Sequence, residues 1–186
     1  MSFELIAVTA NTEWKKAVEY KEFLTKAREN VEIIKARYND LIIGESYHDT
    51  IKSIQNNVKI LVIGNDRCED TAGTLPILAK IADNSPKVEL RILDSDANAS
   101  YHQQFTVNGK RKTPVVLFLN SDFEELCRWI ERPNAVYKLI NEATSPSPES
   151  RKNELRKLYS DSEIQQQTLH EFMRLILRAD FILGRA

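Results

Sequence analysis

The sequence predicts an α/β fold in which a mixed sheet of four to five strands carries helices on both faces. From Val58 onward, short apolar runs typical of buried strands alternate with longer segments whose apolar residues recur every three or four positions. The last two apolar runs are separated only by the turn residues Asn120-Ser121-Asp122, which indicates a hairpin. Strand–helix–strand order followed by a hairpin places parallel and antiparallel pairs in one sheet.

Residues 1–50 are predicted to form an N-terminal helical extension. Asn11 or Thr12 can cap a helix start, and a single helix is expected over 12–38. A short helix is expected near 49–54, before the first strand. The apolar and aromatic residues of the long segment recur at helical spacing: Trp14, Val18, Leu24, Val31, Ile34 and Tyr38.

Residues 51–145 are predicted to form the central domain. Its strands are expected at 58–63, 88–93, 114–119 and 124–130, and its helices at 69–83, near 96–106 and at 133–143. The buried face of the first of these helices should carry Leu75, Leu78 and Ile81 or Ala82.

Residues 146–186 are predicted to form a C-terminal helical segment that packs on the domain. A linker rich in Ser and Pro at 144–150 should precede two helices, at 150–160 and 162–182. A stripe at helical spacing usually packs against a core, although a dimer surface is the alternative, so both a monomer and a homodimer stay open. The stripe consists of Leu169, Phe172, Met173, Ile176, Leu177 and Ile182.

The composition favours a soluble globular protein. Of 186 residues, 42% are hydrophobic and 28% charged, and the net charge of −1 argues against nucleic acid or an anionic membrane as partner. Two cysteines far apart form neither a disulfide framework nor a metal-type pair, and the scattered His48, His102 and His170 suggest no metal site. We expect a cytoplasmic location, because the N-terminus lacks a basic region followed by a long apolar stretch.

Cys68 is the residue placed best for chemistry. It follows the apolar run at 58–63 and opens the helix expected at 69–83. Free N–H groups and the dipole at a helix start favour the thiolate, which is the reactive form of cysteine. Pro114 comes directly before a later strand, where a proline can hold a cis peptide and leave adjacent backbone free for a guest chain.

This layout resembles the thioredoxin superfamily, and most closely its branch with an extra N-terminal helical segment. The resemblance implies a thioredoxin-like fold, with a cis-proline at Pro114 that faces the nucleophilic Cys68. The pieces that carry it are Cys68-Glu69-Asp70, Leu75-Pro76-Ile77-Leu78, Val88-Glu89-Leu90-Arg91-Ile92-Leu93, Asn108 through Pro114 and Trp129-Ile130-Glu131-Arg132-Pro133.

The motif departs from the superfamily pattern. Thr71 stands where thioredoxins carry their second cysteine, Arg67 replaces the usual Trp, and Val62 replaces an often present buried acid. The resemblance therefore implies a monothiol thiol-disulfide oxidoreductase in which Cys68 attacks and Thr71 hydrogen-bonds the thiolate. A cysteine without a resolving partner forms mixed disulfides that a second thiol, such as glutathione or another small thiol, must clear.

The expected substrate is a protein disulfide or a small thiol, held beside Cys68 without a cofactor. A basic loop, Lys110 to Lys112, could bind carboxylates with Arg67, or could simply be solvated. A non-catalytic binding module that uses the same groove is the alternative function, and Cys127 is expected to be a buried, inert thiol. The expected substrate-binding residues are Arg67, Glu69, Asp70, Lys112, Thr113 and Pro114.

Overall fold

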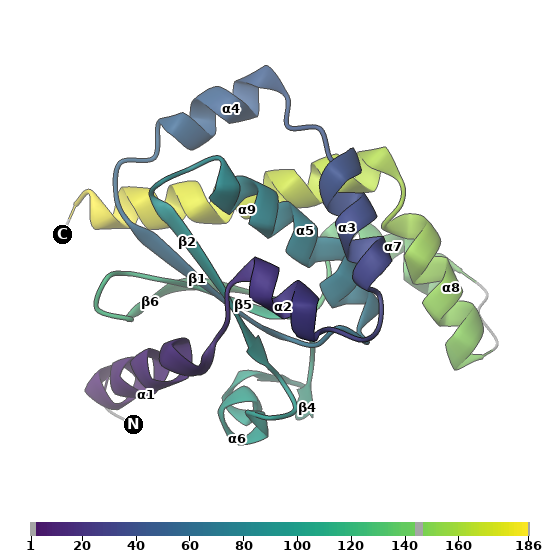
Figure 1. Ribbon diagram of the computed structural model, residues 1–186, viewed down its shortest axis with the longest axis horizontal. Coiled ribbons are helices and arrows are strands. Elements are labelled where there is room, and N and C mark those ends of the chain that lie inside the picture. The colour runs from purple at the N-terminus through teal and green to yellow at the C-terminus, as the bar shows by residue number, and fades with distance from the viewer. Residues whose placement is uncertain (1–2, 144–146, 186) are drawn as a thin grey trace.

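The computed structural model describes residues 3–143 and 147–185, and its centre is a four-stranded mixed sheet with the order β2-β1-β5-β6. β1 pairs parallel with β2 and antiparallel with β5, which pairs antiparallel with β6 (Figure 1). The strands are β1 (Val58–Gly64), β2 (Val88–Asp94), β5 (Val115–Leu119) and β6 (Glu125–Ile130). The predicted α/β class is confirmed.

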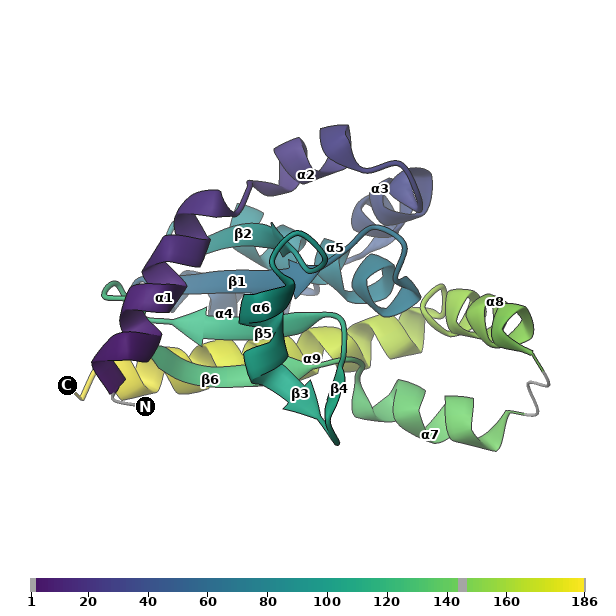
Figure 2. The ribbon, with the colours of Figure 1, turned by 90° about the horizontal axis from the view of Figure 1, so that it is seen from below.

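Helices cover both faces of the sheet because β1 and β5 are apolar on both sides. Ile60, Val62 and Phe118 pack with α5 (Glu69–Asp83) and α9 (Ser162–Leu183) on one face. On the other face, a second cluster lies beneath α1 (Phe3–Lys16) and α6 (Ala99–His102), the two helices that Figure 2 shows in front of the sheet. That cluster includes Leu61, Ile63, Val115, Leu117 and Leu119. Buried on both faces, these strands read as continuous apolar runs.

Helix α5 is enclosed along most of its length. Every residue from Glu69 to Ala79 is buried, since α3 (Val31–Asp40), α8 (Pro148–Leu158) and α9 contact the sides that the sheet leaves open. The predicted burial of Leu75, Leu78 and Ile81 is confirmed. The helix therefore has a fixed position, which matters because Cys68 lies at its start.

The N-terminal extension is helical, but the prediction of one helix over 12–38 is wrong. The chain forms α1, α2 (Tyr20–Lys26) and α3, followed by α4 (Glu45–Lys52). Between α1 and α2, Val18 is extended and exchanges two backbone hydrogen bonds with Ile92 of β2, at 2.9 and 2.8 Å. Between α2 and α3, Asn30 adopts a left-handed conformation with φ of 53°. Pairing with the sheet edge thus overrides the helical periodicity.

Two further boundaries differ from the prediction. The helix expected near 96–106 is only α6 and a 3-10 turn, η1 (Gln103–Phe105), before a small hairpin of β3 (Thr106–Val107) and β4 (Lys110–Arg111). Its turn uses Asn108 and Gly109, both at positive φ. Helix α8 begins at Pro148, inside the expected linker, and residues 144–146 lie outside the described residues.

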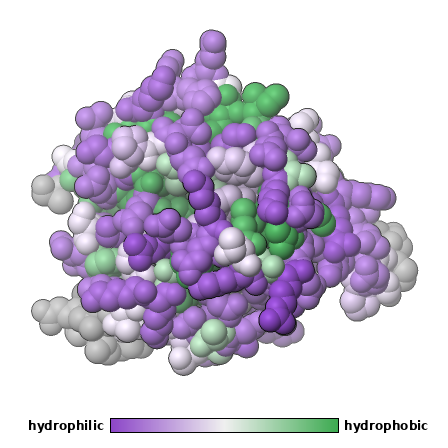
Figure 3. All heavy atoms as spheres, in the orientation of Figure 1, coloured by the Kyte–Doolittle hydropathy of each residue, from purple (hydrophilic) through white to green (hydrophobic). Residues whose placement is uncertain are grey.

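The C-terminal segment packs on the domain. In α9, Leu169, Phe172, Met173 and Ile176 are buried, whereas Ile182 near its end is exposed. A third cluster connects α7 (Asn134–Glu142) with α8 and α9, and consists of Val136, Ile140, Leu155, Tyr159 and Ile164. Figure 3 shows a surface that is mainly hydrophilic on the face it presents. No helix in the described parts of the chain has the length and apolarity that crossing a bilayer requires.

Candidate active site

Cys68 is the N-cap of α5, as the sequence predicts. Its backbone is extended, with φ of −81° and ψ of 124°, and its carbonyl accepts the first helical bond, from Ala72 N–H at 2.9 Å. Asn65 supports the preceding turn: its Oδ1 accepts from the backbone N–H groups of Arg67 and Cys68, each at 3.1 Å. Asn65 Nδ2 in turn donates to Ser95 Oγ at 3.0 Å. The thiol is thus held at the C-terminal end of β1.

The Cys68 thiol lies against the loop that precedes β5. The half-buried Sγ donates to the carbonyl oxygen of Thr113 at 3.4 Å, and the Thr113–Pro114 peptide bond is cis. The Pro114 carbonyl accepts from Glu131 N–H at 2.8 Å, whereas no described residue accepts a hydrogen bond from Thr113 N–H. The thiol therefore contacts a residue whose own backbone N–H is unused among the described residues.

Thr71 is fully buried one turn into α5. A Cβ added to Gly64 would come within 3.0 Å of Thr71 Oγ1 and 3.6 Å of Pro114 Cβ, so Gly64 lets Thr71 pack at the end of β1 beside the proline. Thr71 Oγ1 has no hydrogen-bond partner among the described residues. Its expected bond to the Cys68 sulfur is not formed, because that thiol is turned to Thr113.

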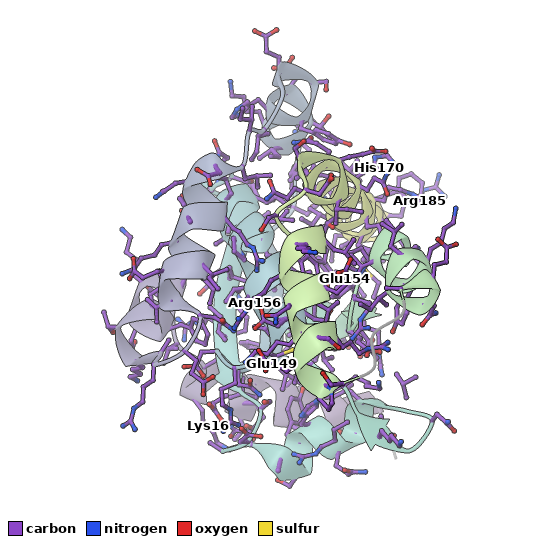
Figure 4. The ribbon with its side chains drawn as sticks, turned by 90° about the vertical axis from the view of Figure 1, so that its right-hand side faces the viewer. Lys16, Glu149, Glu154, Arg156, His170 and Arg185 are labelled. Carbon is purple, nitrogen blue, oxygen red and sulfur yellow. The ribbon has the colours of Figure 1, made fainter. Side chains whose placement is uncertain are left out.

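Glu69 and Asp70 point into the protein, and their burial disfavours the expected contact with substrate. Each is only 5% exposed. Glu69 Oε1 lies 3.0 Å from an Arg156 guanidinium nitrogen, and Figure 4 shows Arg156 on the side of α8 that faces α3 and α5. Asp70 accepts from Arg132 Nη2 and from Tyr159 Oη, both at 2.7 Å. Burial raises the pKa of Asp70, although Arg132 and Tyr159 act in the opposite direction.

Glu131 links the ion pair of Asp70 and Arg132 to the loop that holds Pro114. Its Oε1 lies 3.0 Å from Arg132 Nη2 and 3.0 Å from Lys112 Nζ, and its Oε2 accepts from Tyr137 Oη at 2.6 Å. Burial alone would raise the pKa of Glu131, but the hydrogen bonds from Tyr137 and Lys112 and the charge of Arg132 lower it overall. The Lys112 ammonium is thereby committed to an internal partner.

The cations expected beside Cys68 fall into two groups. Lys112 pairs with Glu131, and Arg67 pairs with Asp96 at the surface. Lys110 and Arg111 are exposed on β4, and neither forms an ion pair with a described residue. Of the four expected cations, Lys110 and Arg111 thus remain without an anionic partner among the described residues.

The N-terminal extension is joined to the Cys68 turn through Asp66. Its Oδ2 accepts from the backbone N–H groups of Arg28 and Glu29, at 2.6 and 2.9 Å. Burial alone would raise the pKa of Asp66, but these two hydrogen bonds lower it overall. A polar hollow of about 320 Å³ opens beside this joint and is lined by Arg28, Glu29, Asn65, Asp66, Arg67, Asp94 and Asp96.

The other candidate ligands and thiols lie outside this arrangement. Cys127 is on β6, where its Sγ donates to the Leu175 carbonyl at 3.6 Å and burial raises its pKa to about 11. His102 Nε2 bonds to the Lys112 carbonyl at 2.8 Å, and His170 Nδ1 to Tyr47 Oη at 2.9 Å. Across residues 3–143 and 147–185, no His, Cys, Asp and Glu side chains gather as a metal site would require.

Sequence reasoning missed Glu131, Arg132, Tyr137 and Tyr159 as neighbours of the site. One signal was present: Gly73 stands in the middle of a helix, where a glycine often marks a close approach. A Cβ at this position would lie 2.2 Å from the Tyr159 ring. The sequence around Gly73 does not show which residue approaches it, because Tyr159 comes from the end of α8.

Comparisons with known proteins agree with this fold. A protein of unknown function from Pseudomonas aeruginosa superimposes with a TM-score of 0.70 at 18% identity, covering 93% of this chain and 96% of that one. An HIV epitope scaffold superimposes with a TM-score of 0.57, also at 18% identity, over 86% of this chain and 98% of that one. No curated protein sequence matches significantly. A family model described as thioredoxin matches residues 17–145, most of the chain, which therefore belongs to the thioredoxin family.

Proposed function

We propose that this protein is a monothiol thiol-disulfide oxidoreductase with Cys68 as its nucleophile. The observation that carries the proposal is the position of the half-exposed Sγ, at the start of α5 and 3.4 Å from the Thr113 carbonyl. Backbone N–H groups in the first turn of a helix favour the thiolate over the thiol. Two observations favour a one-cysteine mechanism. Thr71 stands where a second cysteine would be, and Cys127 lies on another element, β6, rather than beside Cys68.

The backbone next to Pro114 is the proposed substrate contact. Thr113 N–H lacks an acceptor among the described residues, and an extended segment of substrate could supply one, as in the addition of a strand to a sheet edge. The exposed Lys110 and Arg111 favour a substrate with carboxylates near its disulfide. Protein disulfides and mixed disulfides of small acidic thiols such as glutathione both fit this description.

The proposed reaction has two exchanges. The Cys68 thiolate attacks one sulfur of the substrate disulfide, the S–S bond breaks, and the departing sulfur leaves as a thiolate that takes a proton from water. Cys68 is now in a mixed disulfide. A small thiol, as its thiolate, then attacks the substrate-derived sulfur of the mixed disulfide, forms a new disulfide with it and releases Cys68 as a thiolate. When the substrate is a mixed disulfide of that small thiol, the products are the reduced protein thiol and the small-thiol disulfide. When the substrate is a protein disulfide, a further molecule of small thiol must attack the new mixed disulfide to complete the reduction.

Trapping the mixed disulfide tests this function. In a Cys127→Ser background, the protein is incubated with glutathione disulfide and the adduct at Cys68 is quantified by mass spectrometry over time. We expect one adduct per chain, its removal by reduced glutathione, and none after Cys68→Ser with the circular dichroism unchanged. Exchange that persists in Cys68→Ser would remove Cys68 from the mechanism.

The alternative function is a non-catalytic binding module of thioredoxin fold, favoured by the loss of the second cysteine at Thr71. The rate of Cys68 alkylation against pH separates the two functions. A midpoint at or above about pH 8.5, the value of an unperturbed thiol, together with no mixed disulfide, would favour the binding module.

A further inference from the structure

His102 lies outside the group of side chains around Cys68, yet it holds the backbone of the loop that meets the thiol. Its Nε2 lies 2.8 Å from the carbonyl oxygen of Lys112, and the residue is 2% exposed. A carbonyl can only accept, so Nε2 carries the proton of this bond. The other ring nitrogen, Nδ1, is buried and has no hydrogen-bond partner among the described residues. Within the described chain, the ring is thus committed to this loop.

The helix that carries His102 is packed firmly on the sheet. His102 is the last residue of α6, and its neighbours Tyr101 and Phe105 are buried. Both belong to the apolar cluster that contains Ile63 of β1 and Val115 of β5. These two strands are the ones that precede the thiol and follow the cis-proline. The ring and the loop are therefore fixed to one rigid framework.

Three consecutive carbonyl groups of the loop, from residue 112 to residue 114, have hydrogen-bond partners. The donors are His102 for Lys112, the Cys68 thiol for Thr113 and the Glu131 N–H for Pro114, at 2.8, 3.4 and 2.8 Å. No described residue accepts a hydrogen bond from the Thr113 N–H. Beside the thiol, this backbone thus has its acceptors occupied and a donor to offer.

The bond from His102 sets the direction of that donor. The Lys112 carbonyl and the Thr113 N–H belong to one planar peptide unit, which is trans, unlike the next one along the chain. The two groups of a trans unit point in opposite directions, so holding the carbonyl toward α6 turns the N–H away from α6. A hydrogen bond to the carbonyl also polarises the amide and strengthens its N–H as a donor.

We propose that His102 is a positioning residue that aims the Thr113 N–H at the backbone of a peptide substrate, and thereby makes Cys68 selective for disulfides within extended peptides. The inference rests on the proposed function in taking Cys68 as the nucleophile and this N–H as a substrate contact. It adds the substrate class. An extended peptide supplies a backbone carbonyl beside its cysteine, whereas a small disulfide without amide groups supplies none.

The test compares two disulfides that release the same thiol, in a Cys127→Ser background. One is a blocked pentapeptide whose central cysteine is joined to mercaptoethanol, and the other is bis(hydroxyethyl) disulfide. In both reactions the Cys68 thiolate forms a new S–S bond, the old S–S bond breaks, and mercaptoethanol leaves as its thiolate. Mass spectrometry gives the rate constant of the peptide adduct and of the mercaptoethanol adduct. The ratio of the first rate constant to the second is the readout.

His102→Phe keeps a ring of similar shape and removes the donor. We expect the ratio to fall about tenfold, the effect of losing one hydrogen bond, with the circular dichroism unchanged. His102→Gln restores an N–H donor and should recover most of the ratio. His170→Phe is the matched control, because His170 bonds to Tyr47 of α4 and its loss should leave the ratio unchanged. Equal losses of rate for the two disulfides in His102→Phe would overturn the positioning role.

Hydrogen exchange at the Thr113 amide tests the substrate contact without any change at residue 102. This amide should exchange more slowly in the peptide adduct than in the mercaptoethanol adduct, because only the peptide brings a backbone carbonyl. Equal exchange in the two adducts would overturn the proposal, and it would do so even where His102→Phe fails to fold.

The outcomes separate this inference from the proposed function. Adducts that form at Cys68 with a ratio insensitive to His102→Phe would support the oxidoreductase and overturn the role of His102. No adduct at Cys68 with either disulfide would refute the oxidoreductase and this inference with it.

Discussion

Replacing Gly73 by alanine tests whether Tyr159 is locked into α5. Alanine is favoured over glycine inside a helix by about 1 kcal/mol, so the substitution should stabilise an unobstructed helix. Here its Cβ would lie 2.2 Å from Cγ and 2.3 Å from Cδ1 of the Tyr159 ring. The ring cannot move aside freely, because it is 1% exposed and its hydroxyl is bonded to Asp70.

The expected change combines three contributions. Overpacking a filled interior costs about 1–3 kcal/mol, and loss of a buried hydrogen bond to a charged group costs about 1–3 kcal/mol more. After subtraction of the helical preference, Gly73→Ala should lower the free energy of unfolding by about 3 kcal/mol. In a chain of this size, this corresponds to a fall in Tm of about 6–12 °C.

Urea unfolding followed by tryptophan fluorescence provides the measurement, and a second background makes it decisive. When Tyr159→Ala has removed the ring, Gly73→Ala should become neutral or stabilise by up to about 1 kcal/mol. Gly44→Ala is the matched control, because no atom lies within 4 Å of its added Cβ. Equal destabilisation in both tyrosine backgrounds, or none in the wild type, would refute the packing described here.

Three further predictions follow from the site. Thr71→Cys should confer reductase activity on a chromogenic disulfide, because position 71 is packed beside Pro114; no gain over wild type would show that the start of α5 is misplaced. Cys127 should resist iodoacetamide at pH 8 until urea is added, since burial raises its pKa to about 11; labelling in the native protein as fast as at Cys68 would contradict this. Asp66 has a lowered pKa in the folded chain, so wild type should be more stable to unfolding than Asp66→Asn. This difference in the free energy of unfolding should be constant above about pH 5 and should decline as pH falls below about 4. A difference that grows in acid would contradict the prediction.

The central strands and α5 could be predicted closely from the sequence because their signals are local. Apolar runs bounded by turns define β1 and β5, and the periodicity of Leu75, Leu78 and Ile81 defines a helix whose bounds match the structure. The placement of Cys68 as N-cap follows from the same boundary. The N-terminal segment was correctly predicted to be helical, but the positions where its helices begin and end were not. The break at Val18 depends on pairing with a strand more than seventy positions away.

The charged surroundings of Cys68 could not be predicted in the same way. Glu69 and Asp70 look like solvent-exposed residues of a first helical turn, where carboxylates are common. They are buried because Arg156, Arg132 and Tyr159 arrive from distant segments. Nothing in the local sequence distinguishes an acid that meets such partners from one that meets water.

The bridge between Val18 and Ile92 bears on self-association. β2 forms one border of the sheet, and an exposed border strand is a template on which another chain can assemble. The two hydrogen bonds from Val18 occupy both backbone groups of Ile92 in the middle of that strand. The segment between α1 and α2 thus protects this edge of the sheet from pairing with another molecule. Val18→Pro removes the backbone N–H of this bridge and should increase strand pairing between molecules.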